Sequence, residues 1–279
     1  MKLLTTIIMT TIAVGGLVSC TGKKATEEQP APKCLVLYYS QNGTTKAVAE
    51  ELQKSLGADI EEIVAEEPYA GNFQETIERC ITEREGQIIP KIKPLQANIA
   101  DYDIVFLGFP IWFGTYARPI YGLLEVEKFA DKKIVPFCTF GSGGLETAIK
   151  DLKAALPEAD IQDGYCVRTA RIAAMPQELN RFLIEQAFIE GTVEPLPEFS
   201  EQQLVTETET GIFNAACSDY EYPLGTPETF AKRPMAGGTE YCFKVIGFAP
   251  DGAKTSTTIY IIAPADTTAK PEFTRVSRD

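Results

Sequence analysis

Hydrophobic residues in this chain fall into short continuous runs, separated by segments in which they recur with helical spacing. The first run covers residues 34–39 and shows no alternation of polar and apolar positions. Such a run is typical of a strand buried on both faces, as in a parallel sheet. Similar runs cover 103–108 and 133–139, while 59–64 and 161–168 are shorter or more polar. We therefore predict five strands, with 59–64 near an edge because of its charges.

Between these runs, apolar residues recur every three or four positions. This spacing predicts amphipathic helices, which we place at 46–56, 73–85, 117–129, 145–155 and 177–188. Strands and helices then alternate throughout residues 34–189. Alternation of this kind predicts an α/β domain with a doubly wound parallel sheet.

Residues 190–279 have a different character, because helical periodicity gives way to threonine, proline and alternating segments. Residues 240–248 alternate and 255–263 pair back on them, which predicts a β-hairpin. We expect a small all-β domain, with 204–216 and Phe230 as candidates for its other strands. The pattern Met235-x-x-x-Thr239-x-Tyr241 resembles the tyrosine-corner stretch of fibronectin type III domains. This domain is either a structural cap on the first domain or a docking surface for a redox partner.

The N-terminus has the layout of a secretory signal. A single lysine precedes an apolar run over 3–18 that is short for a membrane span. Its ending, Leu17-Val18-Ser19-Cys20, resembles the lipobox of bacterial lipoproteins, which implies removal of residues 1–19 and lipidation of Cys20. Residues 20–33 would form a flexible tether. We therefore expect an exported protein that a lipid anchor holds on the periplasmic face or cell surface; a short anchor helix is the alternative.

Composition excludes several classes of function. The 279 residues carry a formal net charge of −13, which argues against nucleic acid as a partner. Histidine is absent, so Ser-His-Asp and Cys-His catalysis are excluded, and no C-x-x-C motif supports a metal site. Cys217 and Cys242 could form a disulfide in an oxidising compartment.

Candidate chemistry begins in the turn after the first strand. Its polar residues lie where the following helix presents amide groups that have no partner within the helix, together with the positive end of its dipole. A phosphate would suit this site, although a plain helix N-cap is the alternative. The candidate residues are Ser40, Gln41, Asn42, Gly43, Thr44 and Thr45.

Two more turns follow buried strands and should lie at the same edge, since ligands of open α/β sheets bind beyond the carboxyl ends of the strands. The second turn holds the only tryptophan of the chain, which could stack on a flat ring or pack beneath the loop. Its candidate residues are Pro110, Ile111, Trp112, Phe113 and Gly114. The third turn is rich in glycine, and its candidates are Thr139, Phe140, Gly141, Ser142, Gly143 and Gly144.

The first turn resembles the phosphate loop of the flavodoxin family, which reads roughly S/T-x-T-G-N-T. Ser40, Gly43 and Thr45 match that pattern, whereas Asn42 and Thr44 depart from it but remain polar. The resemblance implies strand order 2-1-3-4-5 and FMN as the cofactor, with its phosphate in the first turn. It also implies that Trp112 stacks on the flavin, that the backbone near Gly114 meets flavin N5, and that the third turn binds the rest of the ring system.

The resemblance leads us to expect an electron carrier that passes electrons one at a time to redox proteins docking at the flavin edge. The first alternative is an FMN-dependent reductase of quinones that uses NAD(P)H, although a stacked Trp112 would obstruct hydride transfer. The second alternative is a lipid-anchored binding module without flavin turnover. The residues themselves offer no catalytic acid, base or nucleophile, so the flavin would supply the chemistry.

Overall fold

The computed structural model describes residues 32–69, 73–141, 143–220, 224–235, 237–248 and 253–278. The predicted signal peptide, Cys20 and most of the tether lie outside the described residues. Within the described residues, no helix is both long enough and apolar enough to cross a membrane.

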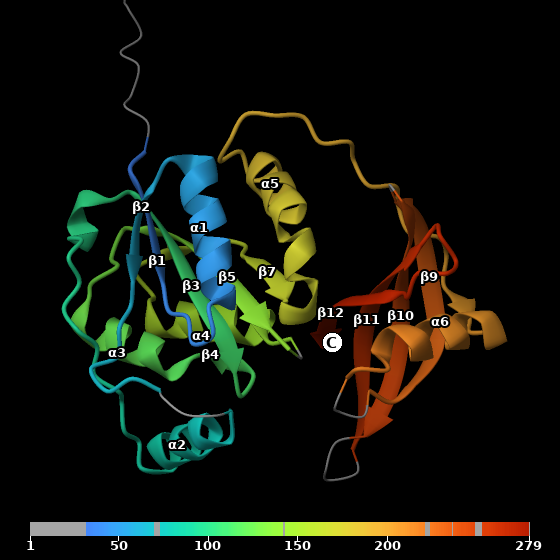
Figure 1. Cartoon of the computed structure of the whole chain (residues 1–279), viewed down its shortest axis with the longest axis horizontal. Helices are drawn as coiled ribbons and strands as arrows, with labels where there is room; N and C mark the ends of the chain where they lie inside the picture. Colours follow the sequence, from blue (N-terminus) through green and yellow to red (C-terminus); the bar gives the residue numbers. More distant parts are fainter. Residues whose placement is uncertain are drawn as a thin grey trace, which may run out of the picture. The chain divides into compact units, whose positions relative to one another are not determined.

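The first sheet is parallel, and its strands run in the order β2-β1-β3-β5-β6, with β7 also pairing with β5 (Figure 1). The short strand β4 is an antiparallel partner of β3, so the parallel strands have the predicted order 2-1-3-4-5. The predicted fold class is therefore confirmed. The strands are β1 (Cys34–Tyr38), β2 (Asp59–Glu62), β3 (Ile104–Trp112), β4 (Thr115–Tyr116), β5 (Lys133–Phe140), β6 (Asp160–Ile161) and β7 (Tyr165–Arg168).

Helices cover both faces of this sheet. Helices α1 (Thr44–Leu56) and α5 (Met175–Glu185) pack on one face, and α3 (Arg118–Val126) and α4 (Leu145–Ala155) pack on the other. Helix α2 (Phe73–Glu85) and the short 3-10 helices η1 (Ile99–Asp101) and η2 (Thr169–Ala174) complete the domain.

Strand β1 shows why its sequence has no alternation. Leu35 and Leu37 belong to the core cluster on one face, whereas Val36 and Tyr38 belong to the cluster on the other. Because successive side chains of a strand point to opposite faces, both sets of positions must be apolar.

The predicted strand over 161–168 is divided into β6 and β7, and Pro136 of the neighbouring strand explains the break. Ile134 pairs with Ile161 and Phe137 pairs with Tyr165, so two residues of β5 face three on the other strand. Pro136 has no N–H to donate to the ladder at this point. A Cβ on Gly164 would lie 2.6 Å from the Pro136 carbonyl oxygen, so only glycine fits in the bulge.

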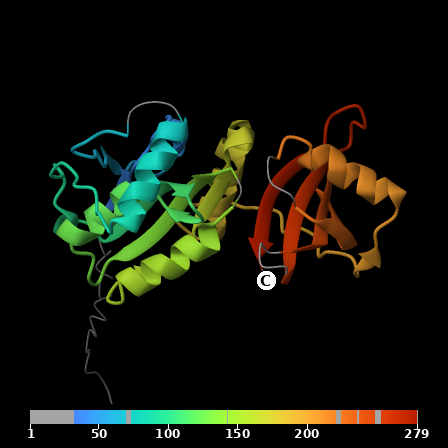
Figure 2. The ribbon, with the colours of Figure 1, turned by 90° about the horizontal axis from the view of Figure 1, so that it is seen from below.

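The C-terminal residues form an antiparallel sheet in the order β12-β11-β10-β9-β8, which confirms the predicted β-rich domain (Figure 2). The predicted hairpin corresponds to β10 and β11. A helix packs on the core of this single sheet, and the resemblance to fibronectin type III domains is not confirmed. Tyr241 packs in that core against Phe230 and Phe243. The strands are β8 (Gln203–Leu204), β9 (Thr226–Met235), β10 (Gly238–Phe248), β11 (Lys254–Pro264) and β12 (Glu272–Arg278). Cys217 and Cys242 are both free thiols.

Of the candidate sources of strands, Leu204 lies in β8 and Phe230 in β9, whereas residues 207–216 form most of helix α6 (Glu207–Cys217). The helix begins with a capping box, Thr206-Glu207-Thr208-Glu209, in which the Thr206 hydroxyl accepts a hydrogen bond from the Thr208 amide and donates one to Glu209. This hydrogen bond from Thr206 is the main cause that lowers the pKa of Glu209. The T-x-x-E spacing is visible in the sequence and could have identified the helix.

Candidate functional site

Ser40 and Asn42 organise the turn between β1 and α1. The Ser40 hydroxyl oxygen accepts hydrogen bonds from the amides of Gly43 and Lys46, at 3.1 and 3.2 Å. The Asn42 side-chain oxygen accepts from the Thr44 amide at 3.3 Å and from the Thr44 hydroxyl at 3.0 Å. Amides at the start of α1 thus donate to side-chain oxygens, which a ligand could replace as acceptors. Oxygen atoms of a phosphate could take the same donors.

Gly43 gives this turn its shape. Its φ of +86° is left-handed, and a Cβ at this position would meet nothing within 4 Å. The backbone conformation, and not a shortage of space, therefore favours glycine here. The open surroundings also leave room for a ligand to approach the main chain.

Thr45 has a different environment from the rest of the turn. It is buried, and its hydroxyl lies 2.8 Å from the hydroxyl of Thr139 near the end of β5. The pair joins the first turn to the strand that leads into the third turn. Thr45 therefore contributes to the position of the turn, and its hydroxyl is engaged within the protein.

Gln41 connects the first turn to the segment after β2. Its side-chain oxygen accepts a hydrogen bond from the Tyr39 hydroxyl at 2.7 Å, and its side-chain nitrogen donates to the Tyr69 carbonyl. Trp112 packs edge-on against the same two tyrosines, with ring centroids 5.6 Å from Tyr39 and 5.2 Å from Tyr69. The indole is half-buried in this aromatic cluster, in the position that we considered as the alternative to stacking.

The second turn is the tip of a hairpin. Strand β3 continues beyond the predicted end at Gly108 as far as Trp112, which pairs with Thr115 of β4. The two residues between them, Phe113 and Gly114, have φ values of +53° and +84°. Positive φ at both central positions is the pattern of a type I′ turn, in which a residue as bulky as phenylalanine is unusual. The Phe113 side chain is 48% exposed and is therefore the accessible aromatic ring of this turn.

The third turn touches the second. Gly144 has a φ of +119° and caps the N-terminus of α4. A Cβ on it would lie 2.6 Å from a methyl carbon of Ile111 and 2.9 Å from the Gly114 carbonyl oxygen, so this contact requires glycine. Thr139 and Phe140 are buried, Gly141 is exposed, and Ser142 lies outside the described residues.

The structure thus brings the three predicted turns to one edge of the sheet, which we call the loop edge. It consists of 40–45, 110–114, 139–141 and 143–144, linked by the Thr45–Thr139 pair and the Gly144 contact. Cys138, next to Thr139, is fully buried, and burial raises the pKa of its thiol. Over the described residues, no cluster of Cys, Asp or Glu side chains is suited to hold a metal ion.

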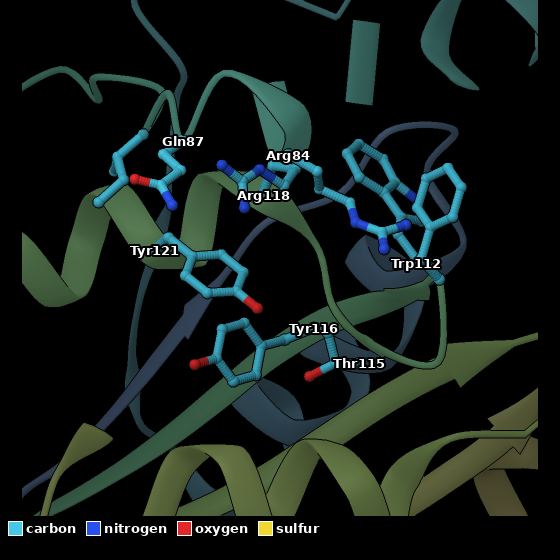
Figure 3. A pocket seen from close by; sticks show the side chains of 9 residues that line it. Arg84, Gln87, Trp112, Thr115, Tyr116, Arg118 and Tyr121 are labelled. Carbon is cyan, nitrogen blue, oxygen red and sulfur yellow. The ribbon is translucent and has the colours of Figure 1, made fainter. Parts of the chain in front are cut away.

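A second feature beside the hairpin was not foreseen from the sequence. It is a pocket of about 420 Å³, which we call the arginine pocket (Figure 3). Trp112 and Phe113 of the loop edge also line this pocket. The pocket is lined by Arg84, Gln87, Ile89, Trp112, Phe113, Thr115, Tyr116, Arg118 and Tyr121.

Comparison with known proteins identifies the family. Residues 33–181, more than half of the chain, match the sequence profile described as flavodoxin. This chain belongs to the flavodoxin family. Membership of the family supports FMN as the cofactor of the loop edge. The main-chain amides that donate to Ser40 fit that assignment, because they could donate to a phosphate instead.

Solved structures of flavoproteins resemble the flavodoxin domain. A protein assigned as a flavoprotein from Bacteroides eggerthii is 29% identical over 54% of this chain and 99% of its own, with a TM-score of 0.46. One from Bacteroides uniformis is 27% identical over 53% and 98%, with a TM-score of 0.48. A flavoprotein of Lactobacillus acidophilus in complex with FMN is 21% identical over 54% and 98%, with a TM-score of 0.45. The search of curated proteins gave no match.

The Thr45–Thr139 pair generates a double-mutant prediction. Thr45→Val or Thr139→Val alone should lower the free energy of unfolding by about 1–3 kcal/mol, because each leaves a buried hydroxyl without its partner. The double variant should lose less than the sum of the two, since no unpaired hydroxyl remains. Urea denaturation of the four proteins measures the coupling. Additive losses would show that the two hydroxyls do not interact.

Proposed function

We propose that this protein binds FMN at the loop edge and transfers electrons through it. The observation that carries the proposal is a set of hydrogen bonds in which amides at the start of α1 donate to the side-chain oxygens of Ser40 and Asn42. These residues lie in the part of the chain that matches the flavodoxin family. The chain contains no histidine, and we assign no acid, base or nucleophile to the loop edge. Bound FMN would therefore supply the redox chemistry.

The residues of the loop edge have separate tasks in this proposal. Ser40, Asn42 and Gly43 present hydroxyl, amide and main-chain groups to the phosphate. Phe113, Gly114 and Gly144 hold the ring system, and Phe113 is the exposed ring that can contact it. Trp112 supports the hairpin through Tyr39 and Tyr69. Gly114 keeps the role expected from the family resemblance, which is to bring flexible main chain close to flavin N5.

The protein would act as an electron carrier. Its formal charge of −13 raises the free energy of adding negative charge to a bound flavin, which favours a low reduction potential. Redox proteins would dock over the exposed flavin edge near Phe113 and Gly141, both of which are exposed. A lipid on Cys20 would hold the carrier at a membrane surface, where such partners can also be anchored.

A second candidate function is an FMN-dependent reductase that takes hydride from NAD(P)H and reduces quinones. The observation that favours it is the position of Trp112. Its edge-on contacts with Tyr39 and Tyr69 hold the indole in the aromatic cluster, which weakens the expectation that a stacked indole obstructs hydride transfer. A binding module without flavin turnover is the remaining alternative.

FMN binding is tested at Ser40. Purified Ser40→Ala should bind FMN about tenfold more weakly than the native protein, because it loses an oxygen that orders the α1 amides and a hydroxyl for the phosphate. Affinity for riboflavin, which has no phosphate, should not change. Titrations of flavin fluorescence measure both affinities, and Ser218→Ala, an exposed serine of the C-terminal domain, serves as the matched control. Equal losses for the two flavins would place the phosphate elsewhere, and a native chain that takes up no FMN would contradict the proposed function.

Reduction of the FMN-loaded protein separates the carrier from the reductase. Controlled titration with a chemical reductant should show two well-separated one-electron steps, and NADH or NADPH should oxidise slowly in stopped-flow mixing. This outcome follows from the excess negative charge, which opposes the second electron. Rapid oxidation of NAD(P)H with a single two-electron step would instead establish the reductase.

The lipid anchor is tested by the substitution Cys20→Ser, which replaces the thiol sulfur with an oxygen. The native chain, expressed in a bacterium that processes lipoproteins, should sediment with membranes and require detergent for release. Cys20→Ser should move to the soluble fraction, because a serine hydroxyl cannot replace the thiol that would carry the lipid. A Cys20→Ser protein that stays with the membranes would show that another segment anchors the chain.

A further inference from the structure

The arginine pocket combines flat aromatic walls with guanidinium groups. Tyr116 and Tyr121 lie with ring centroids 4.7 Å apart. The Arg118 guanidinium carbon is 4.7 Å from the centre of the Tyr121 ring, and that of Arg84 is 5.1 Å from the centre of the Phe113 ring. The pocket volume of about 420 Å³ lies in the usual range for small-molecule sites, roughly 300–1,000 Å³.

The positive charge in this pocket is only partly compensated. Glu83 is the carboxylate beside Arg118, with 3.5 Å between its oxygen and the Arg118 Nε atom. The same carboxylate already accepts hydrogen bonds from Tyr69 at 2.6 Å and from Arg79 at 2.8 Å. One buried acid is thus shared among several donors.

Arg118 shows the consequence of this sharing. Its Nε atom is buried and has no hydrogen-bond partner, while one of its terminal nitrogens donates to the Ile88 carbonyl. A buried donor without an acceptor costs free energy. An anion in the pocket could accept from the Arg84 guanidinium, which is exposed, and would add negative charge close to Arg118.

None of the nine residues that line the pocket carries a carboxylate. The nearby carboxylate of Asp151 already accepts a hydrogen bond from the Thr115 hydroxyl at 2.6 Å. Burial raises the pKa of Tyr116, so its hydroxyl stays protonated. The pocket therefore presents arginines and neutral rings to a ligand.

The backbone around the pocket carries strain. Among the described residues, four residues other than glycine have positive φ, and two of them, Gln87 and Phe113, line this pocket. Such conformations cost on the order of 1–3 kcal/mol each and cluster at functional sites. Phe113 occupies a turn position that asparagine or glycine would fill with less strain, which indicates that its ring contributes to ligand binding.

We propose that the arginine pocket binds a small planar aromatic carboxylate. Arg84 and Arg118 attract the carboxylate, since guanidinium groups match carboxylates in shape and charge, and the ring lies among Phe113, Tyr116 and Tyr121. Because Phe113 also belongs to the loop edge, a ligand in the pocket would lie beside the hairpin that we assign to the flavin ring. The proposal concerns a second binding site and does not depend on FMN.

The probe pair for a test is 2-naphthoate and its neutral analogue 2-naphthalenemethanol, added to the full chain as purified, without added flavin. Isothermal calorimetry should show that the acid binds about tenfold more tightly than the alcohol. Fluorescence of Trp112 provides a second signal, because Trp112 lines the pocket and is the only tryptophan of the chain. Added salt should weaken only the acid.

Arg84→Gln should weaken 2-naphthoate binding about fivefold or more and leave 2-naphthalenemethanol unchanged. Arg118→Gln should have the same effect on both ligands. If this variant does not fold because Arg118 makes buried contacts, the result for Arg84→Gln is the deciding test, since Arg84 is exposed. Arg181→Gln, which alters an arginine paired with Glu185 on α5, is the matched control and should bind like the native protein.

The proposal fails if acid and alcohol bind equally, if neither binds at millimolar concentration, or if Arg84→Gln and Arg181→Gln have the same effect. Because Arg84 is not part of the loop edge, the comparison of Arg84→Gln with Arg181→Gln is independent of whether the loop edge binds FMN. Inorganic phosphate should compete only weakly with 2-naphthoate. If phosphate bound the pocket as tightly as 2-naphthoate, the arginines would form a general anion site, and the proposal of an aromatic ligand would be wrong.

Discussion

The amides at the start of α1 impose the constraint on which the site depends. A helix leaves its first N–H groups without partners in its own backbone, and here they emerge at the end of a buried strand. Ser40 and Asn42 satisfy amides of Gly43, Thr44 and Lys46 with side-chain oxygens. Side-chain oxygens can move aside for a ligand, whereas backbone carbonyls in a ladder cannot. These amides thus have hydrogen-bond partners without an anion and yet remain donors that can bind one.

Close packing then fixes the other two turns relative to the first. The Thr45–Thr139 pair ties the start of α1 to β5, and Gly144 allows the third turn to lie against Ile111 and Gly114. At Gly144 even a Cβ atom would require its neighbours to shift. The loop edge is therefore held in place by the sheet beneath it, and a planar ligand would meet a surface that is largely preformed.

The order of the parallel strands could be predicted from the sequence, but the break in the last strand and the orientations of side chains at the loop edge could not. Continuous apolar runs predicted the parallel strands, because strands covered on both faces need apolar residues at successive positions. The break between β6 and β7 depends on Pro136 of a neighbouring strand, so a strand-by-strand interpretation could not reveal it. The orientation of Trp112 likewise depends on Tyr39 and Tyr69, which are distant in sequence. The α6 capping box, by contrast, is local and was overlooked.

The arginine pocket could not be predicted, since its two charged residues belong to different helices. Arg84 lies near the end of α2 and Arg118 at the start of α3, and only the fold places both beside the Phe113 hairpin. Net charge is also misleading here, because a chain with a formal charge of −13 would be expected to repel anions. Screening limits such repulsion to about 10 Å at ordinary ionic strength. Within that range Arg79 and Arg118 share the buried Glu83 carboxylate, and Arg84 adds an exposed positive charge, so local charge determines what the pocket can bind.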